Sequence, residues 1–103
     1  MTIMKVEYTR VVIDFMMREI TSKSVYEKID GYRTILSLFP EIGRIYDPLY
    51  DAARPPFPCR FIPVPDTPFT MYCTINNAES CVIVFAIEYQ RSDPFSRFSE
   101  LDI

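Results

Sequence analysis

Two consecutive stretches, 69–75 and 81–87, constrain the fold of this chain most strongly. The first reads Phe-Thr-Met-Tyr-Cys-Thr-Ile and the second reads Cys-Val-Ile-Val-Phe-Ala-Ile. Side chains that are β-branched or aromatic favour extended backbone. The polar segment between the two stretches begins with Asn76 and Asn77, which tolerate the positive φ of a tight turn. The pattern predicts an antiparallel β-hairpin.

Alternation along a strand sends successive side chains to opposite faces of the sheet. In the first strand, one face should receive Phe69, Met71, Cys73 and Ile75, and the other Thr70, Tyr72 and Thr74. In the second strand, the same rule groups Cys81, Ile83, Phe85 and Ile87 against Val82, Val84 and Ala86. Both groups of the second strand are apolar, which predicts a strand in the sheet interior with packing on both faces.

The N-terminal part of the chain predicts a strand and then a helix. Residues 5–8 alternate between polar and apolar side chains, as a short strand does. Thr9 is a suitable N-cap, because its hydroxyl can accept a hydrogen bond from the first turn of a helix. Apolar residues recur every three or four positions over 10–20, which predicts an amphipathic helix.

A second helix is predicted over 24–39. Ser24 and Glu27 form the sequence signature of a capping box at its start. Gly31 weakens its middle by about 1 kcal/mol relative to alanine. Pro40 ends it, because the residue before a proline avoids the helical region. The two helices should form an antiparallel hairpin whose combined apolar stripe covers one face of the strands.

Eight of the nine prolines lie between residues 40 and 68. Proline is excluded from helix interiors and from fully paired central strands. We therefore interpret 44–58 as an ordered loop and 59–62 as a short strand that ends at Pro63. The chain then forms one α+β domain over 1–103, with the order β-α-α-β-β-β and a three- to four-stranded antiparallel sheet.

Composition excludes several classes of function. The chain has no histidine, so a histidine-based triad or metal site is excluded, and we expect no bound metal or cofactor. A net charge of −3 disfavours broad attachment to nucleic acid. The three cysteines lack metal-ligand spacing and are interpreted as small buried hydrophobic residues. No stretch has the length of a membrane span or the apolar core of a signal peptide, so a cytoplasmic location without membrane contact is expected.

Three short motifs carry a resemblance to a known family. They are the helix end and turn at 35–43 (Ile-Leu-Ser-Leu-Phe-Pro-Glu-Ile-Gly), the strand at 69–75, and the strand at 82–87 with the tail Tyr89-Gln-Arg91-Ser-Asp93-Pro94. In order and spacing they resemble the RelE/ParE toxin superfamily, and the ParE and plasmid-stabilisation branch more than the RelE branch. The resemblance implies the toxin of a type II toxin–antitoxin pair.

Function and partners follow from this resemblance as expectations. A ParE-like toxin binds a cellular protein, DNA gyrase in the family's case, and is neutralised by a cognate antitoxin; a homodimer is also compatible with it. The residues expected at the partner-binding surface are Arg91, Tyr72, Tyr89, Phe95 and Phe98. This surface should be the sheet face that the helices leave uncovered, edged by Thr70, Tyr72, Thr74 and the exit of the chain at Arg91.

Two alternatives remain at this stage. The first is a RelE-like endoribonuclease that cleaves ribosome-bound mRNA, with Arg60, Arg91, Tyr89 and Arg97 as its catalytic set. The family's strand arginine falls on Phe69 or Thr70 and its tail tyrosine falls near Phe95 or Phe98, so we favour a protein that is not an enzyme. The second is an interaction module that keeps the toxin fold without toxicity.

The proline-rich segment also offers aromatic residues. Tyr46, Tyr50 and Phe57 are able to line a groove for a partner, since aromatic residues supply interface anchors. Packing of the loop onto the domain is the interpretation that we favour for them.

Overall fold

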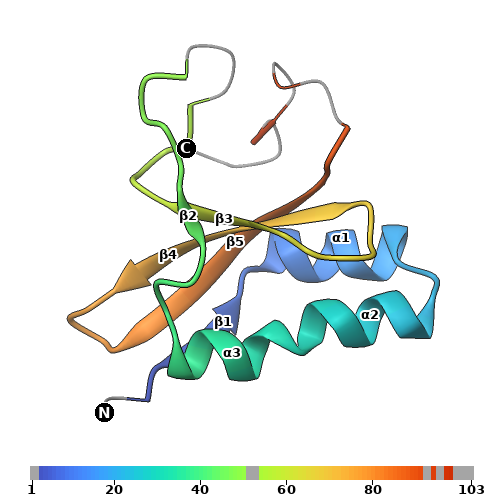
Figure 1. Ribbon diagram of the computed structural model, residues 1–103, viewed down its shortest axis with the longest axis horizontal. Coiled ribbons are helices and arrows are strands. Elements are labelled where there is room, and N and C mark those ends of the chain that lie inside the picture. The colour runs from blue at the N-terminus through green and yellow to red at the C-terminus, as the bar shows by residue number, and fades with distance from the viewer. Residues whose placement is uncertain (1–2, 51–53, 92–93, 95–96, 99–103) are drawn as a thin grey trace.

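The computed structural model describes residues 3–50, 54–91, 94 and 97–98. Strands and helices follow one another in an α+β arrangement, with the helices confined to the N-terminal part (Figure 1). The elements are β1 (Lys5–Tyr8), α1 (Arg10–Glu19), α2 (Lys23–Asp30), α3 (Tyr32–Leu38), β2 (Arg44–Ile45), β3 (Arg60–Pro63), β4 (Phe69–Asn76) and β5 (Cys81–Tyr89). Within the described residues, no helix is long and apolar enough to cross a membrane.

The sheet has five strands in the order β1-β5-β4-β3-β2. The predicted hairpin is confirmed, because β4 and β5 pair antiparallel at its centre. The prediction of a wholly antiparallel sheet with three to four strands is wrong, since β1 pairs parallel to β5 and the sheet is mixed. Parallel neighbours need a long crossover connection. Here the whole chain between residues 8 and 81 supplies that connection.

The predicted loop over 44–58 contains an additional short strand. Arg44 and Ile45 pair antiparallel with Phe61 and Arg60 of β3, forming β2 at the edge of the sheet. Two residues are too few to show alternation, so the sequence pattern could not reveal this strand. Strand β3 itself extends through Pro63, one residue beyond its predicted end.

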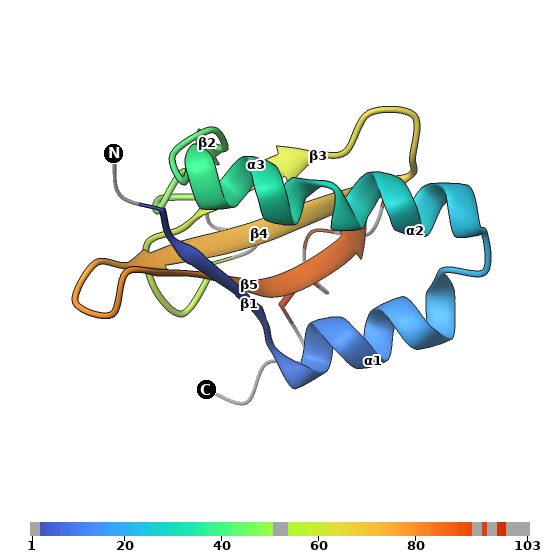
Figure 2. The ribbon, with the colours of Figure 1, turned by 90° about the horizontal axis from the view of Figure 1, so that it is seen from below.

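The helices begin and end close to their predicted positions. Thr9 caps α1 as predicted, and its hydroxyl accepts a hydrogen bond from Val12 N. The predicted capping box at Ser24 is wrong, because Ser22 is the N-cap of α2 and accepts from Val25 N. The second predicted helix is divided at Gly31, which keeps a right-handed helical conformation (φ −58°, ψ −27°) between α2 and α3. Together α2 and α3 run back against α1 (Figure 2).

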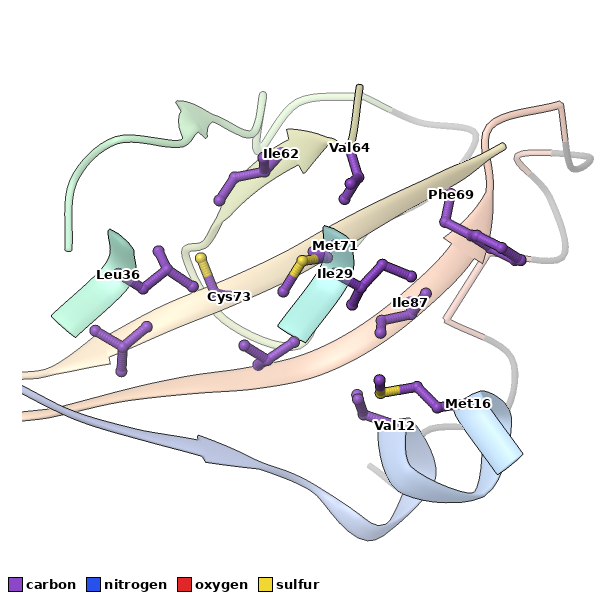
Figure 3. Packing of buried hydrophobic residues seen from close by; sticks show 12 residues of the cluster. Val12, Met16, Ile29, Leu36, Ile62, Val64, Phe69, Met71, Cys73 and Ile87 are labelled. Atoms are coloured by element: carbon purple, nitrogen blue, oxygen red, sulfur yellow. The ribbon is translucent and has the colours of Figure 1, made fainter. Parts of the chain in front are cut away.

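The main core lies between the helices and one face of the sheet (Figure 3). Val12, Met16, Ile29 and Leu36 supply its helical side, which confirms that both predicted helices cover the same face. The strands contribute a set of buried residues: Ile62, Val64, Phe69, Met71, Cys73, Val82, Val84 and Ile87. The predicted inward set of the first strand is confirmed, with Ile75 packed at its border.

A β-bulge at Phe85 overturns the predicted faces of the second strand. Tyr72 pairs with Ala86 while Cys73 pairs with Val84, so Phe85 is the extra residue on β5. A bulge of this kind breaks the alternation of side chains. Val82, Val84 and Ile87 therefore face the helices, whereas Ile83, Phe85 and Ala86 face the other side.

Candidate functional site

The sheet face opposite the helices carries a cluster of rings that we call the aromatic face. Its buried residues are Tyr46, Cys59, Tyr72, Phe85, Ala86 and Phe98, and Phe61 and Ile83 pack against them. Tyr50 and Phe57 are respectively 39% and 40% exposed and contact this cluster through Tyr46 and Phe85. In the described part of the chain, loops rather than helices lie on this side of the sheet (Figure 1). The aromatic face is the candidate site.

Tyr46 lies at the centre of the ring contacts. Its ring centroid is 5.7 Å from that of Phe98, 5.9 Å from that of Tyr72 and 6.1 Å from that of Phe61. The three pairs are edge-to-face, the geometry that the ring quadrupole favours. Tyr72 and Phe98 are closer still, at 5.0 Å. Residues from a loop, a strand and the C-terminal segment are thus held as one packed unit.

Arg97 brings a positive charge into this unit. Its guanidinium carbon lies 5.9 Å from the ring centroid of Tyr46, 5.8 Å from that of Tyr50 and 5.9 Å from that of Tyr72. Nη1 donates a hydrogen bond to Tyr46 Oη at 2.9 Å. Nε is buried and has no hydrogen-bond partner among the residues that the structure describes. We call this group of four residues the arginine–tyrosine cage.

Glu88 helps to hold Phe98 on the aromatic face. Its Oε1 accepts a hydrogen bond from Phe98 N at 3.0 Å. Phe98 has a φ of 65°, a left-handed conformation that is uncommon for a bulky residue. Burial raises the pKa of Tyr72 to about 12, although nearby Arg97 acts to lower it. Tyr72 is therefore uncharged at neutral pH.

Two residues of the predicted partner surface are brought together, namely Tyr72 and Phe98. Tyr89 is not with them, because the bulge at Phe85 places it on the helix side of the sheet. There its hydroxyl donates to Glu19 Oε1 at 3.0 Å and its ring lies 4.8 Å from that of Phe69. The hydrogen bond to Glu19 raises the pKa of Tyr89. The structure therefore places Tyr89 and Tyr72 on opposite faces of the sheet.

The remaining predicted residues are dispersed. Arg91 follows the end of β5, is exposed, and lines a depression of about 520 Å³ with Asp66 and Gln90. Arg60 donates from Nη1 to the backbone oxygens of Gly43, at 2.9 Å, and Glu41, at 3.3 Å. Phe95 lies outside the described residues. The predicted catalytic set does not converge, because Arg60 holds a turn, Tyr89 lies on the helix side and Arg97 lies in the cage.

Two buried cysteines, Cys59 on the aromatic face and Cys73 in the main core, are not prepared for nucleophilic chemistry. Burial raises the pKa of Cys59 to about 12 and that of Cys73 to about 11. A thiol reacts as its thiolate, so these two cysteines are inert at neutral pH. In the described ranges, no group of three metal-ligating side chains is present.

The sequence favours packing of the loop onto the domain for Tyr46 and Tyr50, and the structure gives them a larger part. They do pack the loop, but they also form two of the three rings around Arg97. The sequence signal for this larger part was the aromatic-rich segment around Tyr46 and Tyr50, which is stiffened by prolines. It did not indicate which arginine the rings would surround.

Comparisons with known proteins gave no match. Protein-family models, curated proteins and solved structures were each searched, and none resembles the chain at a significant level. The resemblance to the RelE/ParE toxins therefore depends on the three sequence motifs.

Proposed function

We propose that this chain is a ParE-like toxin that acts by binding a protein through its aromatic face. The observation that carries this proposal is a packed unit of aromatic rings and one arginine on the sheet face that the helices leave uncovered. Tyrosine, phenylalanine and arginine are enriched at protein interfaces. Tyr50 and Phe57 offer exposed rings next to the buried ones, as an anchor site requires.

The same geometry argues against catalysis. A ribonuclease must activate a 2′-hydroxyl and stabilise charge on a phosphate, which requires several groups aimed at one point. Arg60, Tyr89 and Arg97 are engaged in three separate places. The geometry therefore supports a binding protein over the endoribonuclease alternative.

The toxin identity comes from the motifs over 35–43, 69–75 and 82–94. On this proposal the protein works in the cytoplasm, its target is a protein such as DNA gyrase, and a cognate antitoxin neutralises it. The alternative that the test must distinguish is a domain that keeps this architecture without toxicity.

Induced expression of the chain alone in a bacterial host tests the proposal. We expect growth arrest, DNA damage of the kind caused by gyrase poisoning, and intact translated mRNA. Cleavage of mRNA within the ribosomal A-site would support the endoribonuclease instead. Unchanged growth at confirmed expression would refute both toxin functions and favour the interaction module.

Arg91→Ala in the same assay examines the basic residue of the tail motif. Arg91 is exposed, so its removal should leave the fold intact. Reduced growth arrest would include Arg91 in the binding surface. Unchanged arrest would confine that surface to the aromatic face.

A further inference from the structure

The arginine–tyrosine cage contains a partly buried positive charge. Arg97 is half-buried, and no ion pair joins it to a carboxylate of the described residues. Taking a charged group out of water is costly unless that group is paired and hydrogen-bonded. The other ion pairs in the described residues lie at exposed positions, where pairing contributes little. A partly buried cation is thus placed in the aromatic face without an ion pair to the described residues.

The hydrogen bonds of Arg97 lead to the same conclusion as its charge. The guanidinium offers five N–H donors in a planar fork. Among the described residues, Nη1 donates a hydrogen bond to Tyr46 and Nε has no acceptor. A buried donor without an acceptor costs more than its hydrogen bond would contribute. Nε is enclosed by the protein, so a ligand with two acceptor oxygens in one plane would be bound by the Nη donors and would balance the charge.

We propose that the cage is a recognition subsite for a carboxylate side chain, aspartate or glutamate, presented by the partner protein of the aromatic face. This inference rests on the proposed protein-binding function and adds the chemistry of the contact. Tyr46 and Tyr72 form the buried wall of the subsite, and Tyr50 is its exposed rim. The rings exclude water around the pair, which strengthens its charge-assisted hydrogen bonds.

A carboxylate fits the cage better than a phosphate of nucleic acid. The cage holds one guanidinium, whereas a nucleic-acid backbone is bound by many cations that neutralise successive phosphates. Glu88 lies nearby, with its carboxylate on the backbone of Phe98, so the described side chains here do not form the cluster of cations that a polyanion needs. The chain as a whole carries a charge of −3. One planar monoanion is the ligand that the local and the overall charge allow.

Titration with a matched pair of probes tests the subsite. The probes are N-acetyl-glutamate amide and its neutral isostere N-acetyl-glutamine amide, followed by NMR on the Arg97 Nε–H signal and the Phe98 backbone amide. We expect a saturable shift of both signals with the glutamate compound and no saturable shift with the glutamine compound. The same titration with inorganic phosphate at equal ionic strength separates the two anion classes.

Variants link the shift to the cage. Arg97→Gln should weaken glutamate binding by about tenfold or more, because a charge-assisted hydrogen bond is lost. Arg44→Gln is the matched control, since Arg44 is an exposed cation of β2 outside the cage. If Arg97→Gln does not fold, Arg97→Lys keeps the charge and removes the fork, and we expect weaker binding there also.

Three outcomes would overturn the inference: equal shifts with the two amides, tighter binding of phosphate than of the glutamate compound, or unchanged binding in a folded Arg97 variant. The titration does not depend on toxicity. A chain that binds the glutamate compound without arresting growth would refute the proposed toxin function and leave the subsite in place. A chain that arrests growth without the titration response would refute the subsite and leave the proposed toxin function in place.

Discussion

Gly43 occupies a position with no room for a side chain. A Cβ at this residue would lie 3.1 Å from Arg60 Cβ, 3.1 Å from Ile62 Cγ1 and 3.2 Å from Phe61 O. We expect Gly43→Ala to lower the free energy of unfolding by about 1–3 kcal/mol, the usual cost of overpacking. Urea denaturation at neutral pH measures this, with an unchanged m-value as the sign of two-state unfolding. An unchanged midpoint would contradict the tight packing of the 43–62 contact.

The pKa of Tyr72 makes stability depend on pH. Burial raises this pKa from 10.0 to about 12, so the folded state holds the phenolic proton more tightly than the unfolded chain. The stabilisation is complete below pH 10 and is lost as the pH rises from 10 toward 12. Burial likewise raises the pKa of Tyr8 to about 12, so both residues contribute to the loss.

Removing the Tyr72 hydroxyl should therefore flatten part of this alkaline loss. We expect Tyr72→Phe to show a smaller decrease in unfolding free energy between neutral pH and about pH 11 than the parent chain does. Urea midpoints at the two pH values supply the measurement. Tyr26→Phe, at an exposed position, is the control and should follow the parent. Identical pH curves for Tyr72→Phe and the parent would exclude Tyr72 from the alkaline transition.

At the scale of the elements, Gly31 interrupts a helix that its own backbone would allow to continue. Its dihedral angles are helical, and its N–H donates to Glu27 O as in an uninterrupted helix. We expect Gly31→Ala to raise the free energy of unfolding by up to about 1 kcal/mol, because alanine loses less backbone freedom. Thermal denaturation and helical circular dichroism follow the change. A lower melting temperature would show that the 3.2 Å approach to Glu27 O is not tolerated.

Elements with strong periodicity were predictable from the sequence. Thr9 and the apolar spacing after it locate α1, and the two apolar runs locate β4 and β5, because local side-chain pattern and backbone preference agree there. The end of the second helix at Leu38 follows from Pro40 in the same way. These features depend on residues that are close together in the sequence, and a local sequence pattern contains that information.

Features that depend on distant pairing were not predictable. The bulge at Phe85 arises because two residues of β5 oppose one of β4, and an apolar run such as 81–87 looks the same with or without it. Its consequence is large, because it moves Tyr89 to the helix side and leaves Tyr72 on the aromatic face. The parallel pairing of β1 and the two-residue strand β2 likewise depend on how the completed sheet closes. The cage around Arg97 was not predictable for the same reason, because its members lie far apart in the sequence, at positions 46, 50, 72 and 97.

At the scale of the whole molecule, the two faces of the sheet have different chemistry. The helix side is closed by Val12, Ile29 and Leu36, all fully buried, and its outer surface exposes some apolar side chains, among them Met17 and Tyr26. The aromatic face is closed by loop and tail residues around a charge. Clustered aromatic rings around a partly buried cation therefore distinguish the aromatic face from the helix side.

This asymmetry predicts where substitutions affect activity. Tyr50→Ala and Phe57→Ala remove exposed rings of the aromatic face, whereas Met17→Ala and Tyr26→Ala remove exposed side chains of the helix layer. Hot-spot aromatic residues contribute about 2 kcal/mol or more to binding, and most other interface residues contribute much less. We expect the first pair to weaken growth arrest strongly at equal expression and the second pair to leave it unchanged. Melting temperatures of the purified variants separate lost binding from lost folding. If the helix-layer pair abolished arrest and the aromatic pair did not, the partner would bind the helices, and the charge of Arg97 would need another explanation.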